Sequence, residues 1–466
     1  MVKKILILTT ILFLVFSAFR MRVDIFIKSM QASIDEVVYY SMGKQVSRDW
    51  TDYNTIPYGH YLKSEGRELP AYFFHPLYKH PPLFTFLVAL SIKIFGARPL
   101  SAIYVSLLFG VLMIPLVYLM GSLIYSRTLG IIAAFLVYLD PVSIMSSQKI
   151  WPDTVLAFFM VLSIYLFLYG LKNNKDNFYI LSGISVGLAV LTKYNGILSL
   201  FGIWLYAVIF RQDLLRKKKF LMTLIIPFLM LLPWFSWTYA VYGPSFIVKQ
   251  ANIHNFSITS WRTLLYLAAF GYLLICSKLF FNLSRESISI NEAFSESKIL
   301  PYVKIILLMV IIFFIREKLV HAVQLFHIPK TSWGSHIFRF GENRCFYFGK
   351  LIEYSPLYIF AYLSFWIPNK NKNQYVPVVK IYAIFIIVFF TIWGSYQSRY
   401  VLGAIPILCI VGCDQLYQLA KNWGSYSKKH LRVLGILTIC FYVFLIIWKL
   451  YYVNINLSFT NDMCYY

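Results

Sequence analysis

Runs of apolar residues long enough to cross a lipid bilayer recur along the chain from Ile5 to its C-terminal end. A spanning helix needs about 20 mostly apolar residues. The runs are continuously apolar and do not alternate with a period of two, so they indicate helices and not the strands of a barrel. Only 13% of the residues are charged, against about a quarter in a soluble domain. The sequence therefore predicts an all-α polytopic membrane protein.

The formal charge of +24 could suggest a nucleic-acid-binding protein. The lysines and arginines, however, lie in short loops between apolar runs, as the positive-inside rule expects, and we reject that class. The six cysteines are scattered without metal-type spacing. No cofactor and no metal ligand is predicted, although the sequence leaves a divalent metal open. The first apolar run lacks a small-residue cleavage site, which favours a retained helix over a signal peptide.

Thirteen spans are predicted, and their orientation follows from the basic loops. The strongest cytoplasmic marker is Arg216-Lys217-Lys218-Lys219, which places the N-terminus in the cytoplasm. The spans fall near residues 5–21, 99–122, 128–147, 154–171, 178–192, 195–210, 220–240, 262–281, 302–320, 351–367, 377–395, 400–420 and 431–451.

A further apolar run, residues 82–96, is predicted to be an interfacial helix. At about 22 Å it is shorter than the hydrocarbon core of about 30 Å, and counting it as a span would turn the N-terminal lysines outward. The prediction is thus one transmembrane domain, 1–466. It comprises a long first outer loop (22–98), core spans (99–210) and variable C-terminal spans (220–451).

Acidic residues follow the first span. Asp35 and Glu36 would lie just above the membrane, where a carboxylate could take the proton of an acceptor hydroxyl as a sugar leaves phosphate. Tyr39 on the same stretch is a further candidate. The alternative is a solvated acidic pair in a loop.

Basic residues precede the predicted interfacial helix. Two prolines suit its first turn, so Lys79 and His80 would sit at its N-terminal end, where the helix dipole favours an anion such as a lipid phosphate. The alternatives are an ordinary helix start with basic residues and, least favoured, a zinc site using His60, His75 and His80.

Three more charged residues stand at outer ends of predicted spans. Asp153 is either a helix N-cap or a second acidic group of the site. Lys193 either snorkels to the surface or pairs with phosphate. Arg399, beside Tyr400, has a planar fork that suits phosphate. All of these face the same side as the first outer loop, which fits transfer from an anionic carrier.

The ordered motifs resemble those of the GT-C fold glycosyltransferases, in particular the dolichyl-phosphate-mannose protein mannosyltransferase family and its bacterial and archaeal relatives. The matching segments are Asp35-Glu36, His80-Pro81-Pro82-Leu83, Pro152-Asp153-Thr154, Gly187-Leu-Ala-Val-Leu-Thr-Lys193 and Ser398-Arg399-Tyr400. The first four occur in the family's order over about the first 200 residues, and the resemblance is weak beyond them.

The resemblance implies transfer of mannose, or another hexose or pentose, from a polyprenyl- or dolichyl-phosphate donor. It also implies inversion, with Asp35 as general base, Asp153 as a second acidic group, and Lys193, Arg399 and His80 on the donor phosphate. The acceptor would be a protein, lipid or glycan on the outer face of the cell membrane, or of the endoplasmic reticulum in a eukaryote.

The large soluble insertion of the eukaryotic members is missing, which leaves the acceptor open. A second acid beside Asp153 is also missing, which argues against a metal-dependent oligosaccharyltransferase. The alternative function is a transporter or flippase for a lipid-linked glycan.

Overall fold

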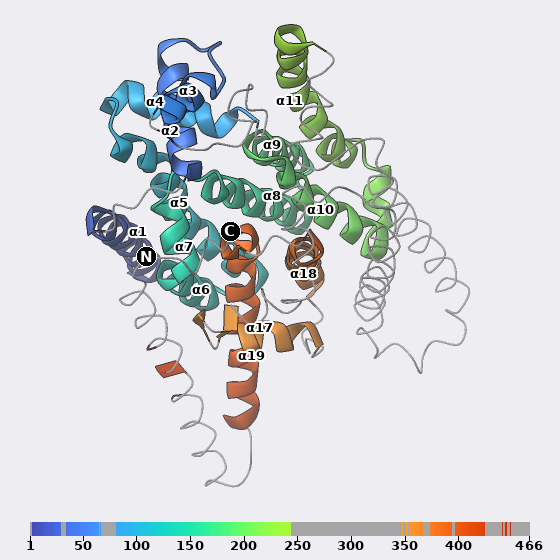
Figure 1. Cartoon of the computed structure of the whole chain (residues 1–466). Helices are drawn as coiled ribbons and strands as arrows, with labels where there is room; N and C mark the ends of the chain where they lie inside the picture. Colours follow the sequence, from blue (N-terminus) through green and yellow to red (C-terminus); the bar gives the residue numbers. More distant parts are fainter. Residues whose placement is uncertain are drawn as a thin grey trace, which may run out of the picture. The chain divides into compact units, whose positions relative to one another are not determined.

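A computed structural model describes most of the first half of the chain and parts of the second. The described residues are 2–28, 34–64, 66, 81–243, 347, 351–352, 354–355, 357–366, 373–393, 397–424, 440, 443–444 and 448. Every regular element among them is helical (Figure 1). Four of these helices are long and apolar enough to cross a membrane, or five if one bent pair counts as a single span. The prediction of an all-α polytopic membrane protein is confirmed, while the predicted spans 262–281 and 302–320 lie outside the described residues.

The described helices fall into two compact units. Unit 1 contains α1 (Val2–Lys28), α2 (Ile34–Arg48), α3 (Ile56–Ser64), α4 (Leu83–Phe95), α5 (Pro99–Ile124), α6 (Arg127–Leu139), α7 (Pro141–Ser147), α8 (Asp153–Asn173), α9 (Asn177–Thr192), the 3-10 turn η2 (Tyr194–Gly196), the start of α10 (Ile197–Phe210) and α11 (Lys218–Tyr242). Unit 2 contains the rest of α10, η3 (Gln212–Arg216), α17 (Leu357–Trp366), α18 (Val376–Trp393), η6 (Ser398–Val401) and α19 (Ile405–Gly424).

Helix α5 is the central element of unit 1. It packs against α1, α4, α6, α7 and α8, while α9 packs between α8 and α11 (Figure 1). Where α5 meets α1 and α6, Leu14, Ala18, Leu107, Ile114 and Ala134 form one buried apolar cluster. This packing fixes the ends of α1, α7 and α8 relative to one another, and those ends carry the charged residues of interest.

The described part of the region predicted as the first outer loop is largely helical. Helix α1 continues beyond the predicted first span, to Lys28, while its apolar part runs from Ile5 to Val23. The predicted short helix is confirmed as α4, which follows Pro82 and ends at Gly96, whose φ of 86° suits a residue without a side chain. Its 13 residues are too few to span a bilayer.

The predicted span 128–147 is broken. Helices α6 and α7 meet at an angle of 60°. The break has a local cause, because Pro141 cannot continue the hydrogen bonding of α6, and Asp140 caps α7 by accepting a hydrogen bond from the Ser143 amide at 2.8 Å.

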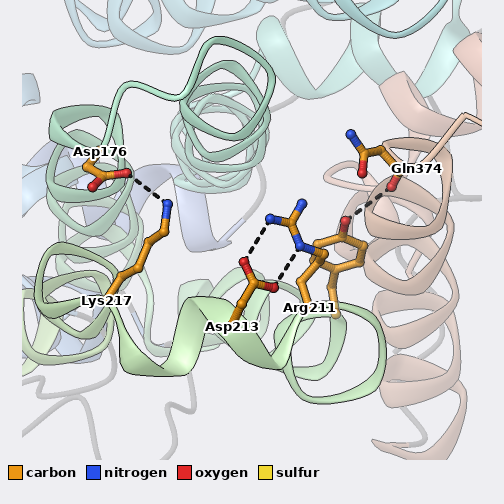
Figure 2. A network of polar contacts seen from close by, with 6 residues as sticks. Asp176, Arg211, Asp213, Lys217 and Gln374 are labelled. Atoms are coloured by element: carbon orange, nitrogen blue, oxygen red, sulfur yellow. Dashed lines mark hydrogen bonds and ion pairs between the residues drawn. The ribbon is translucent and has the colours of Figure 1, made fainter.

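In unit 2 the two longer helices, α18 and α19, match the predicted spans 377–395 and 400–420. Helix α19 begins only at Ile405, because residues 398–401 form a 3-10 turn. The hydroxyl of Tyr206 donates to the Gln374 carbonyl, which joins α10 to the start of α18 (Figure 2). The predicted span 431–451 lies almost entirely outside the described residues.

Candidate functional site

The acidic pair forms the first turn of α2, and its two carboxylates have different surroundings. Asp35 is half-buried. Glu36 is 4% exposed and accepts hydrogen bonds from the Lys149 ammonium at 3.3 Å and from the Ile150 amide at 3.2 Å. Glu36 is therefore bound within the protein, and Asp35 is the member of the pair that a substrate can reach more readily.

A second ion pair joins α8 to the end of α9. The Lys193 ammonium lies 3.0 Å from the Asp153 carboxylate, and the two side chains are 14% and 2% exposed. Pro152, not Asp153, occupies the N-cap position of α8, so the capping interpretation of Asp153 is wrong. The snorkelling interpretation of Lys193 does not fit either, because its ammonium group is paired inside the protein.

The two ion pairs are joined by one short segment, residues 148–152, which we call the connector. It links α7 to α8 and carries Lys149 and Ile150 at one end, with Asp153 following the other. Trp151 is 2% exposed, and its carbonyl accepts a hydrogen bond from Ser106 of α5 at 3.1 Å. Lys149 was missed as a site residue, although it lies three residues before Pro152-Asp153-Thr154, the segment that resembles the family's second acidic motif.

Helix α5 also supports the connector through a glycine. A Cβ added at Gly110 would lie 2.5 Å from the Ser147 Cβ and 3.4 Å from a methyl group of Thr154. These two residues flank the connector, so the close approach at Gly110 sets its position. No pattern in the sequence marks this contact, because Gly110 lies inside an ordinary apolar run.

The two tyrosines that follow the acidic pair, Tyr39 and Tyr40, make contacts within the protein. Tyr39 is 4% exposed and packs edge-on against Phe84, with ring centroids 5.2 Å apart, in the apolar cluster between α2 and α4. Burial raises the pKa of the neighbouring Tyr40 phenol, whose hydroxyl donates to the Ala97 carbonyl at 2.8 Å. Both therefore hold α2 against the α4 region.

The remaining predicted residues belong to other segments of the chain. Lys79 and His80 lie outside the described residues. Arg399 belongs to unit 2, where it is 6% exposed and its Nε donates to Gln397 at 2.7 Å. Its guanidinium lies 5.5 Å from the centre of the Tyr400 ring, which stacks on Phe390. Across the described part of the chain, no group of three or more His, Cys, Asp or Glu residues could hold a metal ion.

Known structures share the fold of this chain. ArnT from Cupriavidus metallidurans in the apo state superimposes with a TM-score of 0.53 and 14% identity, over 98% of this chain and 72% of that one. ArnT bound to undecaprenyl phosphate has a TM-score of 0.53 and 15% identity, over 97% of this chain and 74% of that one. The archaeal oligosaccharyltransferase AglB from Archaeoglobus fulgidus, in complex with an inhibitory peptide and a dolichol-phosphate, has a TM-score of 0.54 and 15% identity, over 97% of this chain and 56% of that one. The chain therefore has the GT-C fold of these membrane proteins.

Sequence comparison finds a family model that matches part of the chain. Residues 79–237 match the model of the dolichyl-phosphate-mannose-protein mannosyltransferase family. An uncharacterized protein of Aquifex aeolicus (strain VF5) is 29% identical over 190 residues, which is 40% of this chain and 38% of the relative. The chain thus spans well under half the length of that curated relative. The resemblance seen in the motifs is confirmed, and the matched segment contains α4, the connector and both Asp153 and Lys193.

Proposed function

We propose that this protein transfers a sugar from a polyprenyl- or dolichyl-phosphate donor to an acceptor on the non-cytoplasmic face of its membrane. The carrying observation is the pair of desolvated lysine–carboxylate contacts on either side of the connector, next to the half-buried Asp35. Charged groups inside a membrane protein are expensive and mark functional sites more often than passive packing. The structures of ArnT bound to undecaprenyl phosphate and of AglB in complex with a dolichol-phosphate support a donor of this class.

In the proposed reaction Asp35 removes the proton from the acceptor hydroxyl. The acceptor oxygen forms a bond to the anomeric carbon as the bond from that carbon to the phosphate oxygen breaks. The electron pair stays on the departing lipid phosphate, and the configuration of the sugar inverts. Mannose or another hexose or pentose fits this scheme, and so does a protein, lipid or glycan acceptor.

Cationic side chains would stabilise the negative charge on the leaving phosphate. Lys193 is suited to this because an ammonium group has three donors, so it can keep Asp153 as a partner and still bind a phosphate oxygen. Asp153 would then hold Lys193 in place. We assign the same phosphate-binding role to Arg399 and His80, with Lys79 as an auxiliary cation. The proposal also includes a cytoplasmic N-terminus, which puts these groups on the outer face.

The test is turnover by purified protein in lipid nanodiscs. The protein is supplied with polyprenyl-phosphate mannose, and in parallel with the glucose and arabinose analogues, together with a membrane extract as a source of acceptor. Mass spectrometry measures the release of free polyprenyl phosphate, which does not require a known acceptor. We expect release with at least one donor, reduced about 100- to 10,000-fold by Asp35→Asn.

The matched control is Asp49→Asn, because Asp49 is an exposed carboxylate just beyond α2. It should leave turnover unchanged. Equal turnover by Asp35→Asn and the wild type would remove Asp35 as the base. In sealed vesicles that contain the same protein, movement of intact donor across the bilayer without release of polyprenyl phosphate would instead establish the flippase alternative.

A further inference from the structure

Arg22, near the end of α1, is buried completely, with 0% of its surface exposed. Its Nε donates to the Ser147 hydroxyl at 2.8 Å, and its own carbonyl accepts a hydrogen bond from the Gln148 amide group at 2.8 Å. A third contact, from Nη1 to the Ala18 carbonyl, is longer at 3.4 Å. Arg22 is therefore hydrogen-bonded to the last residue of α7 and to the first residue of the connector.

The described surroundings of Arg22 do not satisfy all of its hydrogen-bond donors. Its Nη2 has no hydrogen-bond partner among the described residues. Asp140, at the break between α6 and α7, lies close enough to attract the guanidinium, but its Oδ1 already accepts from the Ser143 amide. A buried charge with an unused donor is a poor way to stabilise a fold, because apolar side chains of similar volume commonly serve as well or better. Its presence is better explained by the geometry that it imposes.

That geometry leads directly to the proposed site. The residue after Gln148 is Lys149, whose ammonium holds Glu36, and the Ile150 amide holds the same carboxylate. Glu36 is adjacent in sequence to Asp35, so the position of the connector determines where the first turn of α2 presents Asp35.

We propose that Arg22 is a positioning residue, which sets the connector so that Lys149 and Glu36 hold Asp35 in its reactive orientation. This rests on the proposed function. Arg22 touches no substrate and acts through the α7 end and the connector. The planar guanidinium suits the task because its donors have fixed directions, which the flexible ammonium of a lysine lacks.

The experiment is a double-mutant cycle on turnover, using Arg22→Met, Lys149→Met and the double variant in the nanodisc assay described above. We expect Arg22→Met to lower kcat about 10- to 100-fold with the KM for the donor unchanged, since a displaced catalytic group costs this much. In the Lys149→Met background the same change should lower kcat by less than about twofold, because the contact between Lys149 and Glu36 is already absent. Arg20→Met is the matched control, being the same change on an exposed residue of the same helix.

Equal factors in both backgrounds would mean that Arg22 contributes independently of the connector, and would overturn the inference. So would wild-type kcat in Arg22→Met. If Arg22→Met does not fold, Arg22→Lys and Gln148→Leu replace it, with the same expectation of a larger loss in the presence of Lys149 than in its absence.

Failure of the proposed function gives a separate result. If the wild type releases no polyprenyl phosphate from any donor, the sugar-transfer proposal fails, and the same cycle is then measured on the melting temperature. Additive shifts for Arg22→Met and Lys149→Met would overturn the connection between the two residues, whereas non-additive shifts would support it without reference to activity.

Discussion

The two ends of helix α9 carry the same kind of ion pair in different environments. At the C-terminal end, Lys193 meets Asp153 at 3.0 Å, with side chains 14% and 2% exposed. At the N-terminal end, Lys217 meets Asp176 at 3.4 Å, with side chains 37% and 36% exposed (Figure 2). The comparison shows that a lysine–aspartate contact says little until its burial is known. The exposed pair is an ordinary surface contact, while the buried pair requires an explanation in terms of function.

The largest difference is expected when each pair loses its carboxylate. Asp153→Asn should lower the free energy of unfolding by about 3–5 kcal/mol, because a buried ammonium then loses its counter-charge. Asp176→Asn should lower it by about 0–1 kcal/mol, because water replaces the partner. Denaturant unfolding of both variants in the same lipid nanodiscs measures the difference, and equal losses would break the distinction between the two ends.

The next largest effect concerns the support of the buried end. Gly110→Ala places a Cβ 2.5 Å from the Ser147 Cβ and should cost about 1–3 kcal/mol by overpacking. The matched control is Gly187→Ala on α9, where the nearest atom is the sulfur of the flexible Met230 side chain at 2.3 Å. The control should be the milder variant in thermal unfolding. A control that is as damaging as Gly110→Ala would show that the connector is not specially constrained.

A smaller effect separates the ends by salt. Lys217→Met should change stability by no more than about 1 kcal/mol at low salt, and this difference should shrink further as salt screens the exposed pair. The loss caused by Lys193→Met should hardly depend on salt, because its pair is shielded from solvent. Melting temperatures of both variants across a salt series check this, and a salt-sensitive loss for Lys193→Met would mean that water reaches the site freely.

The smallest expected effect concerns the exposed carboxylate of Asp49, which is hydrogen-bonded by Thr51. The backbone amide and the hydroxyl of Thr51 hydrogen-bond Asp49 and hold the pKa of that carboxyl below its usual value. A lowered pKa in the folded state adds stability above the unfolded pKa, and this contribution is lost as the pH falls through the folded pKa. Thr51→Ala should move the pKa of Asp49 upward, as seen by NMR titration of labelled aspartate. The substitution leaves the backbone amide in place, so an unchanged pKa would show that the hydrogen bond from the Thr51 hydroxyl is not formed in solution.

Much of the fold could be predicted because its signals are local. The apolar runs located α1, α5, α8, α9 and α11. The prolines before residue 83 and the glycine at 96 bounded α4. The bend at Asp140 had a local signal too, an Asp-Pro pair that caps and starts a helix, but the apolar character of the run concealed it.

The candidate site was only partly predictable, because its contacts join distant parts of the chain. Asp153 and Lys193 could be selected as polar residues at span ends. The pairing of Glu36 with Lys149, 113 residues apart, depends on how α2 and the connector pack, and no spacing rule contains that information. Arg22 gives the opposite lesson. It directly follows the predicted span 5–21, yet α1 continues past it and its side chain is completely buried.

The bend between α6 and α7 changes the thickness of membrane that this part of the protein can match. The 13 residues of α6 extend about 20 Å, whereas the hydrocarbon layer measures about 30 Å. Hydrophobic mismatch of this size is met by a local thinning of the bilayer or by neighbouring protein. Under the proposed function, thinning beside α6 would draw lipid headgroups inward toward the connector, so a phosphate carried on a lipid would have a shorter distance to travel before it met Lys193.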